Sequence, residues 1–235
     1  NAEGSDSPDS SRRDLCRLFS QFVLAKGLGL PAAKDGETAV EIDPSIITIG
    51  QSLPPEQPYS DPRVRVVVND ARSFLKSSEP QQFDTVVFGF LDSHTLLSSL
   101  STLRIDNYVY TVESFREAMR ALRPEGRLAV TFTTATTWLK TRLYGLMVTA
   151  LGEHPQTTKV RYTNGRIFWG TRKADWQPPS EAKTEVAIAQ ANLPTDDWPF
   201  LYLDDPGIPA HYLYFMVVIV LLGAASFLNW SSLRC

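Results

Sequence analysis

Cysteine and histidine are scarce in this sequence, and positive charge is not in excess. The two cysteines, Cys16 and Cys235, lie at opposite ends of the chain, which excludes a framework of disulfide bonds. The three histidines are scattered without metal-ligand spacing: His94, His154 and His211. Lys and Arg number 23 against 26 Asp and Glu, for a net charge of −3. We therefore expect no metal site, and no nucleic-acid partner, because such a partner requires a basic face.

Two stretches lack the residues that a folded domain needs. Residues 1–10 lack large hydrophobic side chains and are predicted to be disordered. Residues 206–233 lack charge, and about 20 apolar residues suffice to cross a bilayer, so residues 210–230 are predicted to form a transmembrane helix. Tyr212 and Trp230 are placed as interfacial anchors, and a buried core helix is the alternative. We expect a membrane protein whose remaining domain, residues 11–208, lies in the cytoplasm.

What the chain does contain is an alternation of apolar strand-like runs with helical patterns. Short connections between such elements favour an α/β fold with an open, mostly parallel sheet. Beyond the last helix, Asn164-Gly165 is a strong two-residue turn signal and predicts a C-terminal hairpin. The predicted strands are Thr38–Asp43, Arg63–Val68, Thr85–Phe90 and Arg127–Phe132, followed by the hairpin strands Lys159–Tyr162 and Arg166–Thr171.

The region before these strands reads as a helix. Its apolar residues recur at helical spacing, which predicts an amphipathic helix over 11–26 with Gly27 as its C-terminal cap. Nucleotide-binding folds place a strand and a glycine-rich turn about 20 residues before their ribose-binding acid. On this interpretation the first strand and the glycine-rich turn are degraded or missing, with Gly27 and Gly29 as a remnant.

Acidic residues stand where the first two clear strands end. Glu41 and Asp43 follow one strand, and Asp70 follows the next. A carboxylate at such a strand end accepts hydrogen bonds from both ribose hydroxyls, and Asp70 is placed to accept from an adenine amino group. The alternative for Asp43 and Asp70 is to cap the helices that follow them. We assign Glu41 to ribose and Asp43 to capping.

Two later clusters are candidates for chemistry. Asp92 and His94 follow the third strand and could carry out acid–base catalysis, or Asp92 could simply cap the next helix. In Asp196-Asp197-Trp198, adjacent carboxylates could receive a cationic group with the indole packed over it. The alternative for this second cluster is a turn whose aromatic residues seal the domain.

Several segments of the sequence resemble the spermidine synthases, and most closely the bacterial membrane-bound spermidine synthase-like proteins. The resemblance covers roughly residues 38 to 230. The segments that carry it are Glu41-Ile-Asp-Pro44, Asn69-Asp-Ala-Arg-Ser-Phe-Leu75, Phe83-Asp-Thr-Val-Val87, Tyr110-Thr-Val-Glu-Ser-Phe115, Leu122-Arg-Pro-Glu-Gly126 and Asp196-Asp-Trp-Pro-Phe200.

This resemblance implies a Rossmann-like S-adenosylmethionine-methyltransferase fold and aminopropyl transfer from decarboxylated S-adenosylmethionine to a small-molecule amine. Glu41 would bind ribose, Asp70 with Ala71 would bind adenine, and Tyr110 would lie on the amine side. In the family, the Asp that deprotonates the amine falls on Gly89 of this chain, and only the second acid of that motif is kept, as Asp92. Soluble relatives pair as dimers, so a homodimer is implied.

Two other functions stay open at this point. Gly89 and the missing glycine turn favour a non-catalytic nucleoside-binding or scaffolding module of a larger membrane protein. A methyltransferase that uses S-adenosylmethionine itself is the third reading.

Overall fold

The structure is a computed structural model of the whole chain. It describes residues 14–18, 36–52, 58–89, 107–133, 136–160, 165–178, 192–203, 207 and 210–232. The chain divides into two compact units, residues 1–202 and 203–235. The disorder predicted for residues 1–10 concerns residues outside the described ranges and stays a prediction.

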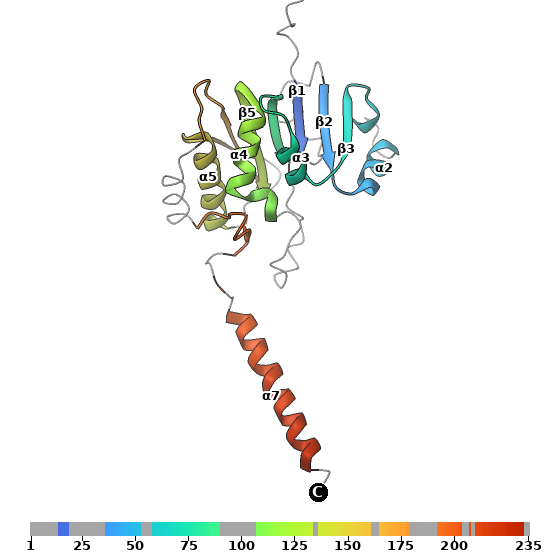
Figure 1. Cartoon of the computed structure of the whole chain (residues 1–235), viewed down its shortest axis with the longest axis vertical. Helices are drawn as coiled ribbons and strands as arrows, with labels where there is room; N and C mark the ends of the chain where they lie inside the picture. Colours follow the sequence, from blue (N-terminus) through green and yellow to red (C-terminus); the bar gives the residue numbers. More distant parts are fainter. Residues whose placement is uncertain are drawn as a thin grey trace, which may run out of the picture. The chain divides into compact units, whose positions relative to one another are not determined.

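The first unit is built on a seven-stranded sheet of order β3-β2-β1-β4-β5-β7-β6 (Figure 1). Strands β1 to β5 pair in parallel, whereas β7 runs antiparallel to both β5 and β6. The sheet is therefore mixed, where a mostly parallel one was predicted. The strands are β1 (Asp14–Leu18), β2 (Gly36–Glu41), β3 (Val64–Val68), β4 (Phe83–Gly89), β5 (Leu122–Thr133), β6 (Gln156–Lys159) and β7 (Gly165–Thr171).

The antiparallel end of the sheet comes from the predicted hairpin, whose second strand is confirmed. Its first strand is Gln156–Lys159 where Lys159–Tyr162 was predicted, and Gly165 belongs to β7. Lys159 pairs with Arg166, and the Val160 amide donates to the carbonyl of Gly165 at 2.9 Å. A short connection can join antiparallel neighbours only, since parallel strands need a long crossover. The turn at Asn164 lies outside the described residues.

The predicted helix over 11–26 is wrong where the structure describes it. Asp14–Leu18 forms strand β1, which pairs in parallel with β2 on one side and β4 on the other. The first strand of the sheet is thus present, at its centre. A five-residue segment is too short for its spacing to distinguish helix from strand. The pairing of β1 with two neighbouring strands decides the matter, and the local sequence does not show it. Gly27 and Gly29 lie outside the described residues.

The helices begin where the sequence provides caps. Thr111 Oγ1 accepts from the Ser114 amide at 3.3 Å at the start of α4, and Thr136 caps α5 in the same way. Figure 1 shows α3, α4 and α5 lying on one face of the sheet. The helices of the first unit are α2 (Pro44–Ser52), α3 (Ala71–Ser77), α4 (Val112–Ala121) and α5 (Thr137–Leu151), with the 3-10 helices η1 (Pro58–Ser60) and η2 (Asn107–Tyr110).

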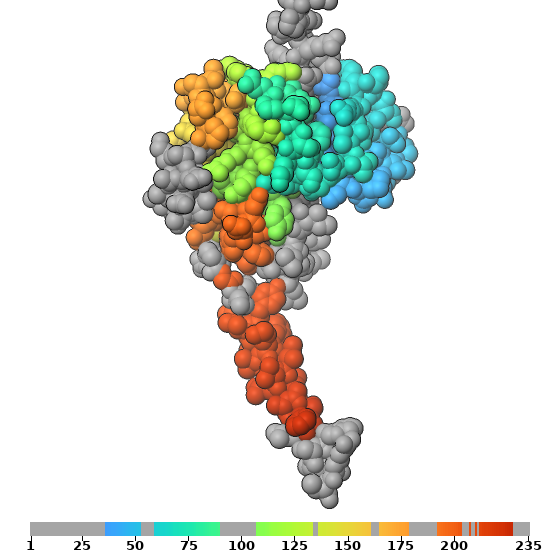
Figure 2. Space-filling view, in the orientation of Figure 1, coloured from blue at the N-terminus to red at the C-terminus, as the bar shows by residue number. Residues whose placement is uncertain are grey.

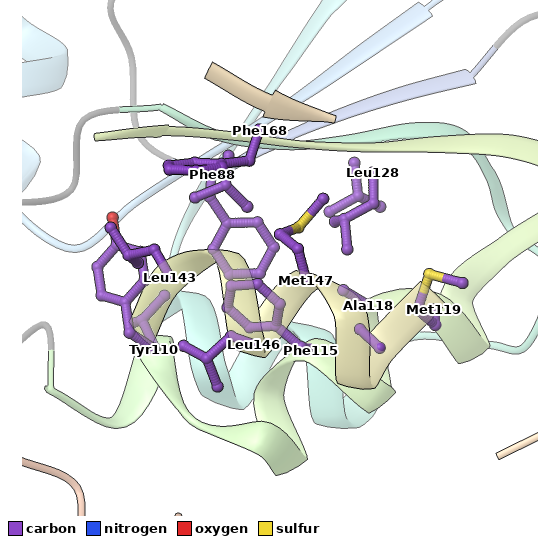
Figure 3. Close-up of a cluster of buried hydrophobic side chains, with 14 of the residues drawn as sticks. Phe88, Tyr110, Phe115, Ala118, Met119, Leu128, Leu143, Leu146, Met147 and Phe168 are labelled. Atoms are coloured by element: carbon purple, nitrogen blue, oxygen red, sulfur yellow. The ribbon is translucent and has the colours of Figure 1, made fainter. Parts of the chain in front are cut away.

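The main hydrophobic core fills the space between this helical layer and the sheet. Phe88 of β4 and Phe115 of α4 are fully buried, with ring centroids 5.1 Å apart. Figure 3 shows the two rings next to one another, with Leu143 and Met147 of α5 nearby. Phe88 is next to last in β4, so the core extends to the carboxyl ends of the central strands.

The second unit contains helix α7 (Ala210–Ser232), of 23 residues. Among the described residues, no helix combines the length and the apolar character that a membrane crossing requires. A helix therefore occupies the predicted residues 210–230, but the predicted membrane crossing is not borne out.

Candidate functional site

The carboxyl ends of the parallel strands form one edge of the sheet, and the polar strand ends meet there. Glu41 is the last residue of β2, and Asn69 follows β3 directly. The Asn69 amide donates to the Glu41 carbonyl at 3.1 Å, which continues the pairing of the two strands past their ends. Because ligands of open α/β sheets bind at this edge, we take it as the candidate site.

Glu41 is the most unusual residue of the edge. Its side chain is buried at 1 % exposure, and Oε1 accepts from the Asp43 amide at 3.2 Å. The other oxygen, Oε2, is buried without a hydrogen-bond partner among the described residues. Burial raises the pKa of this carboxyl above its ordinary value of 4.5, while the backbone amides of Asp43 and Ile42 lower it in part. An unsatisfied buried carboxylate oxygen is costly unless a ligand donates to it.

Asp43 and Asp70 act as helix caps in this structure. Asp43 Oδ1 accepts from the Ser45 amide at 2.8 Å, where α2 begins. Asp70 Oδ1 accepts from the Ser73 amide at 2.8 Å, where α3 begins. Asp70 therefore lies at the candidate edge with one carboxylate oxygen committed to its helix, and Ala71 follows it at the first helical position.

Two apolar residues at this edge were not singled out by sequence reasoning. Ile42, directly after Glu41, is 49 % exposed, and Val68 at the end of β3 is 59 % exposed. Val68 is the strand partner of Glu41, so both residues offer apolar surface close to the buried carboxylate. They are suited to pack against the face of a flat ring. The signal in the sequence that could have identified Ile42 is its position between two acidic residues, Glu41 and Asp43.

Of the residues expected to carry out acid–base catalysis or to stand in their place, the structure describes only Gly89. Gly89 is buried at the end of β4 and pairs with Thr131 of β5. It presents no side chain there that could accept a proton. The catalytic candidates Asp92 and His94 lie outside the described residues, so their roles stay predictions.

The cluster around Asp196 is pinned to the helices. Asp196 Oδ2 accepts from Arg72 Nη2 at 2.7 Å, and Oδ1 accepts from Thr111 Oγ1 at 2.8 Å. Its neighbour Asp197 is exposed, and the Trp198 ring packs edge-on against Phe200 with centroids 5.7 Å apart. The carboxylate of Asp196 is thus already engaged by a cation of the chain itself.

Tyr110 lies in the core rather than at the surface of the edge. It is fully buried, and its ring meets Phe132 edge-on at a centroid distance of 5.1 Å. Its predicted place on the amine side would therefore require the covering residues to move. Among the residues that the structure describes, no group of three or more His, Cys, Asp or Glu side chains is arranged to hold a metal ion.

No protein-family model and no curated protein matches this sequence. The structure, however, is similar to solved structures. A probable spermidine synthase from Corynebacterium glutamicum aligns with a TM-score of 0.50 at 15 % identity, over 83 % of this chain and 73 % of that one. The spermidine synthase from Thermotoga maritima aligns with a TM-score of 0.54 at 10 % identity, over 83 % and 66 % of the two chains. Human methyltransferase-like protein 13, in complex with SAH, aligns with a TM-score of 0.53 at 14 % identity, over 87 % and 88 %.

The domain has the spermidine synthase-like class I methyltransferase fold. At these identities the likeness shows the fold alone. A further similar structure, at 14 % identity and a TM-score of 0.51, is a spermidine synthase in complex with the transition state analogue AdoDATO. The Rossmann-like class I methyltransferase fold expected from the sequence is therefore confirmed, with a mixed sheet.

Proposed function

We propose that this domain binds the adenosine part of decarboxylated S-adenosylmethionine and transfers the aminopropyl group to an amine. The observation that carries the proposal is the buried Glu41 carboxylate, whose Oε2 has no partner among the described residues. A ribose offers two neighbouring hydroxyl donors, and a strand-end carboxylate is the usual acceptor for such a pair. The residues present therefore fit the ribose of such a ligand.

The surroundings of Glu41 suit the rest of an adenosine. Ile42 and Val68 expose apolar surface at the strand ends, which suits the flat face of a purine. Asp70 stands at the next strand end and can accept from an exocyclic amino group with its second oxygen. These contacts would orient the ligand before any chemistry occurs, and orientation is the main source of rate in a displacement between two bound reactants.

When bound, the sulfonium supplies an electrophilic carbon to a neutral amine. The chain's own task is to hold the amine and to take its proton. Gly89 cannot take that proton, and the loss of a positioned base typically costs about 10²- to 10⁴-fold in rate. We therefore assign the holding of the amine to Asp92 and the proton to His94, and expect slow transfer.

A methyltransferase that uses S-adenosylmethionine is the second candidate. Two observations favour it: Gly89 in place of a base, and the similarity to methyltransferase-like protein 13, which covers 87 % of this chain and 88 % of that protein. A methyl transfer to an acceptor that is already nucleophilic needs no base at this position.

A parallel calorimetric titration of the full chain distinguishes these candidates. The ligands are decarboxylated S-adenosylmethionine, S-adenosylmethionine and methylthioadenosine. We expect micromolar binding of the decarboxylated donor and of methylthioadenosine. Preference for S-adenosylmethionine would replace the proposal with the methyltransferase, and no heat from any ligand on folded protein would leave a non-catalytic module.

A further inference from the structure

Residues 193–202, hereafter the strap, cross the candidate edge as an irregular segment. Leu193 and Leu201, near the two ends of the strap, are buried at 2 % and 0 % exposure. A β-bridge between Thr195 and Trp198 folds the middle of the strap into a turn. Figure 2 shows the strap in orange, on the surface next to the green atoms of the α4 region.

The strap is bonded to the starts of two helices that follow strands of the candidate edge. The Val112 amide donates to the Pro194 carbonyl at 3.0 Å, and the Asp196 amide donates to Glu113 Oε2 at 2.9 Å, both at the start of α4. At the start of α3, Arg72 Nη2 donates to Asp196 Oδ2 at 2.7 Å. Asp196 thus connects the α3 side of the edge with the α4 side.

Arg72 is one residue away from the adenine side of the site. It follows Ala71 directly in the first turn of α3, whose cap is Asp70. The guanidinium is held between Glu117 of α4 and Asp196 of the strap. Because Arg72 lies in the first turn of α3, its ion pair with Asp196 ties the strap to the turn at Asp70 and Ala71.

The far end of the strap reaches the other half of the edge. Tyr202 packs on Phe132 at a ring-centroid distance of 6.1 Å, and Phe132 is next to last in β5. Phe132 in turn contacts the buried ring of Tyr110. The strap therefore touches both the α3 turn on the adenine side and the aromatic residues beneath the ends of β4 and β5.

We propose that the strap is a coupling element of the ligand site, and that Asp196 is a positioning residue that acts through Arg72 on the turn at Asp70 and Ala71. This inference rests on the proposed adenosine site. It replaces the predicted role of Asp196 as a receptor for a cationic substrate, because Arg72 already occupies its carboxylate.

The charges around Arg72 indicate that a variant of Asp196 tests the proposal better than a variant of Arg72. One guanidinium faces two carboxylates, those of Glu117 and Asp196. Removal of the Asp196 charge leaves Arg72 paired with Glu117, so the domain should stay folded. Removal of Arg72 would leave the two carboxylates to repel one another. The domain would then lose stability, and a loss of ligand affinity could not be assigned to the site alone.

The test compares Asp196→Asn with Asp84→Asn. Asp84 also forms an ion pair at 2.7 Å, with Arg123, but it lies near the start of β4, at the opposite edge of the sheet. We expect Asp196→Asn to weaken methylthioadenosine binding by about tenfold, while Asp84→Asn leaves it unchanged. Equal affinities of Asp196→Asn and the wild type would overturn the inference.

A second measurement needs no variant, because coupling between two places is reciprocal. Saturating methylthioadenosine should slow hydrogen exchange at the Asp196 and Trp198 amides of the wild-type chain. Binding without any change at these amides would show that the strap is only structural. If the wild-type chain binds none of the ligands, the proposed function itself fails, and this inference fails with it.

Discussion

Glu41→Gln is expected to weaken methylthioadenosine binding by about 10- to 100-fold and to stabilise the folded domain at the same time. Hydrogen bonds to a charged group contribute about 1.5–3 kcal/mol, and an amide lacks both the charge and the second acceptor oxygen. The stability changes in the opposite direction because the wild-type carboxylate is buried with Oε2 unpartnered among the described residues. Gln removes the buried charge and is close to Glu in size.

The stability part of this prediction has a definite pH dependence. The folded-state pKa of Glu41 is raised by burial, so the folded state favours the protonated form. The cost of the charge is therefore fully present above the raised pKa. It decreases as the pH falls through that value, and it vanishes below the unfolded value of about 4.5. The excess stability of Glu41→Gln should follow the same course.

Glu37→Gln is the matched control for this experiment. Glu37 is also buried, at 6 % exposure, and lies in the same strand, but near the amino end of β2. Its substitution should leave ligand affinity unchanged. The account is contradicted if Glu41→Gln binds as tightly as wild type, or if Glu37→Gln loses binding to the same degree.

Phe115→Ala is expected to have the largest effect on stability. Its ring is fully buried in α4, contacts Phe88 at 5.1 Å and lies within the cluster drawn in Figure 3. Truncation of a buried Phe removes its transfer free energy and leaves a cavity, for a loss of about 3–5 kcal/mol. Urea unfolding measures this as a lower midpoint with an unchanged slope.

Tyr108→Ala provides the comparison for this variant. Tyr108 is an aromatic residue of η2 with 52 % exposure, so its truncation should cost well under 1 kcal/mol. Similar losses for the two variants would mean that α4 does not pack on the sheet as described.

Most of the fold was predictable because its signals are local. Thr111 and Asp70 mark helix starts by their own side chains, which accept hydrogen bonds from the Ser114 and Ser73 amides. Strand β1 was missed because what makes it a strand is its two neighbours, β2 and β4, and not its own spacing. A short stretch of sequence does not show which distant strands it will pair with.

The candidate site likewise contains residues with local sequence signals and residues whose contacts are long-range. Glu41 was predictable because a strand end and an acid are neighbours in sequence. The engagement of Asp196 was not, because its partners Arg72 and Thr111 are 124 and 85 positions away. The exposure of Ile42 and Val68 also depends on what covers them in three dimensions, and periodicity alone would place both inside.

If Glu41 binds the ribose of a nucleoside, the pH dependence of methylthioadenosine affinity must differ between wild type and Glu41→Gln. Two hydroxyl donors favour the carboxylate, so binding should lower the pKa that burial has raised. Wild-type affinity should then be constant at neutral pH and fall on acidification through the raised pKa, while the affinity of Glu41→Gln stays weak and flat. Parallel pH profiles for the two proteins would contradict the claim.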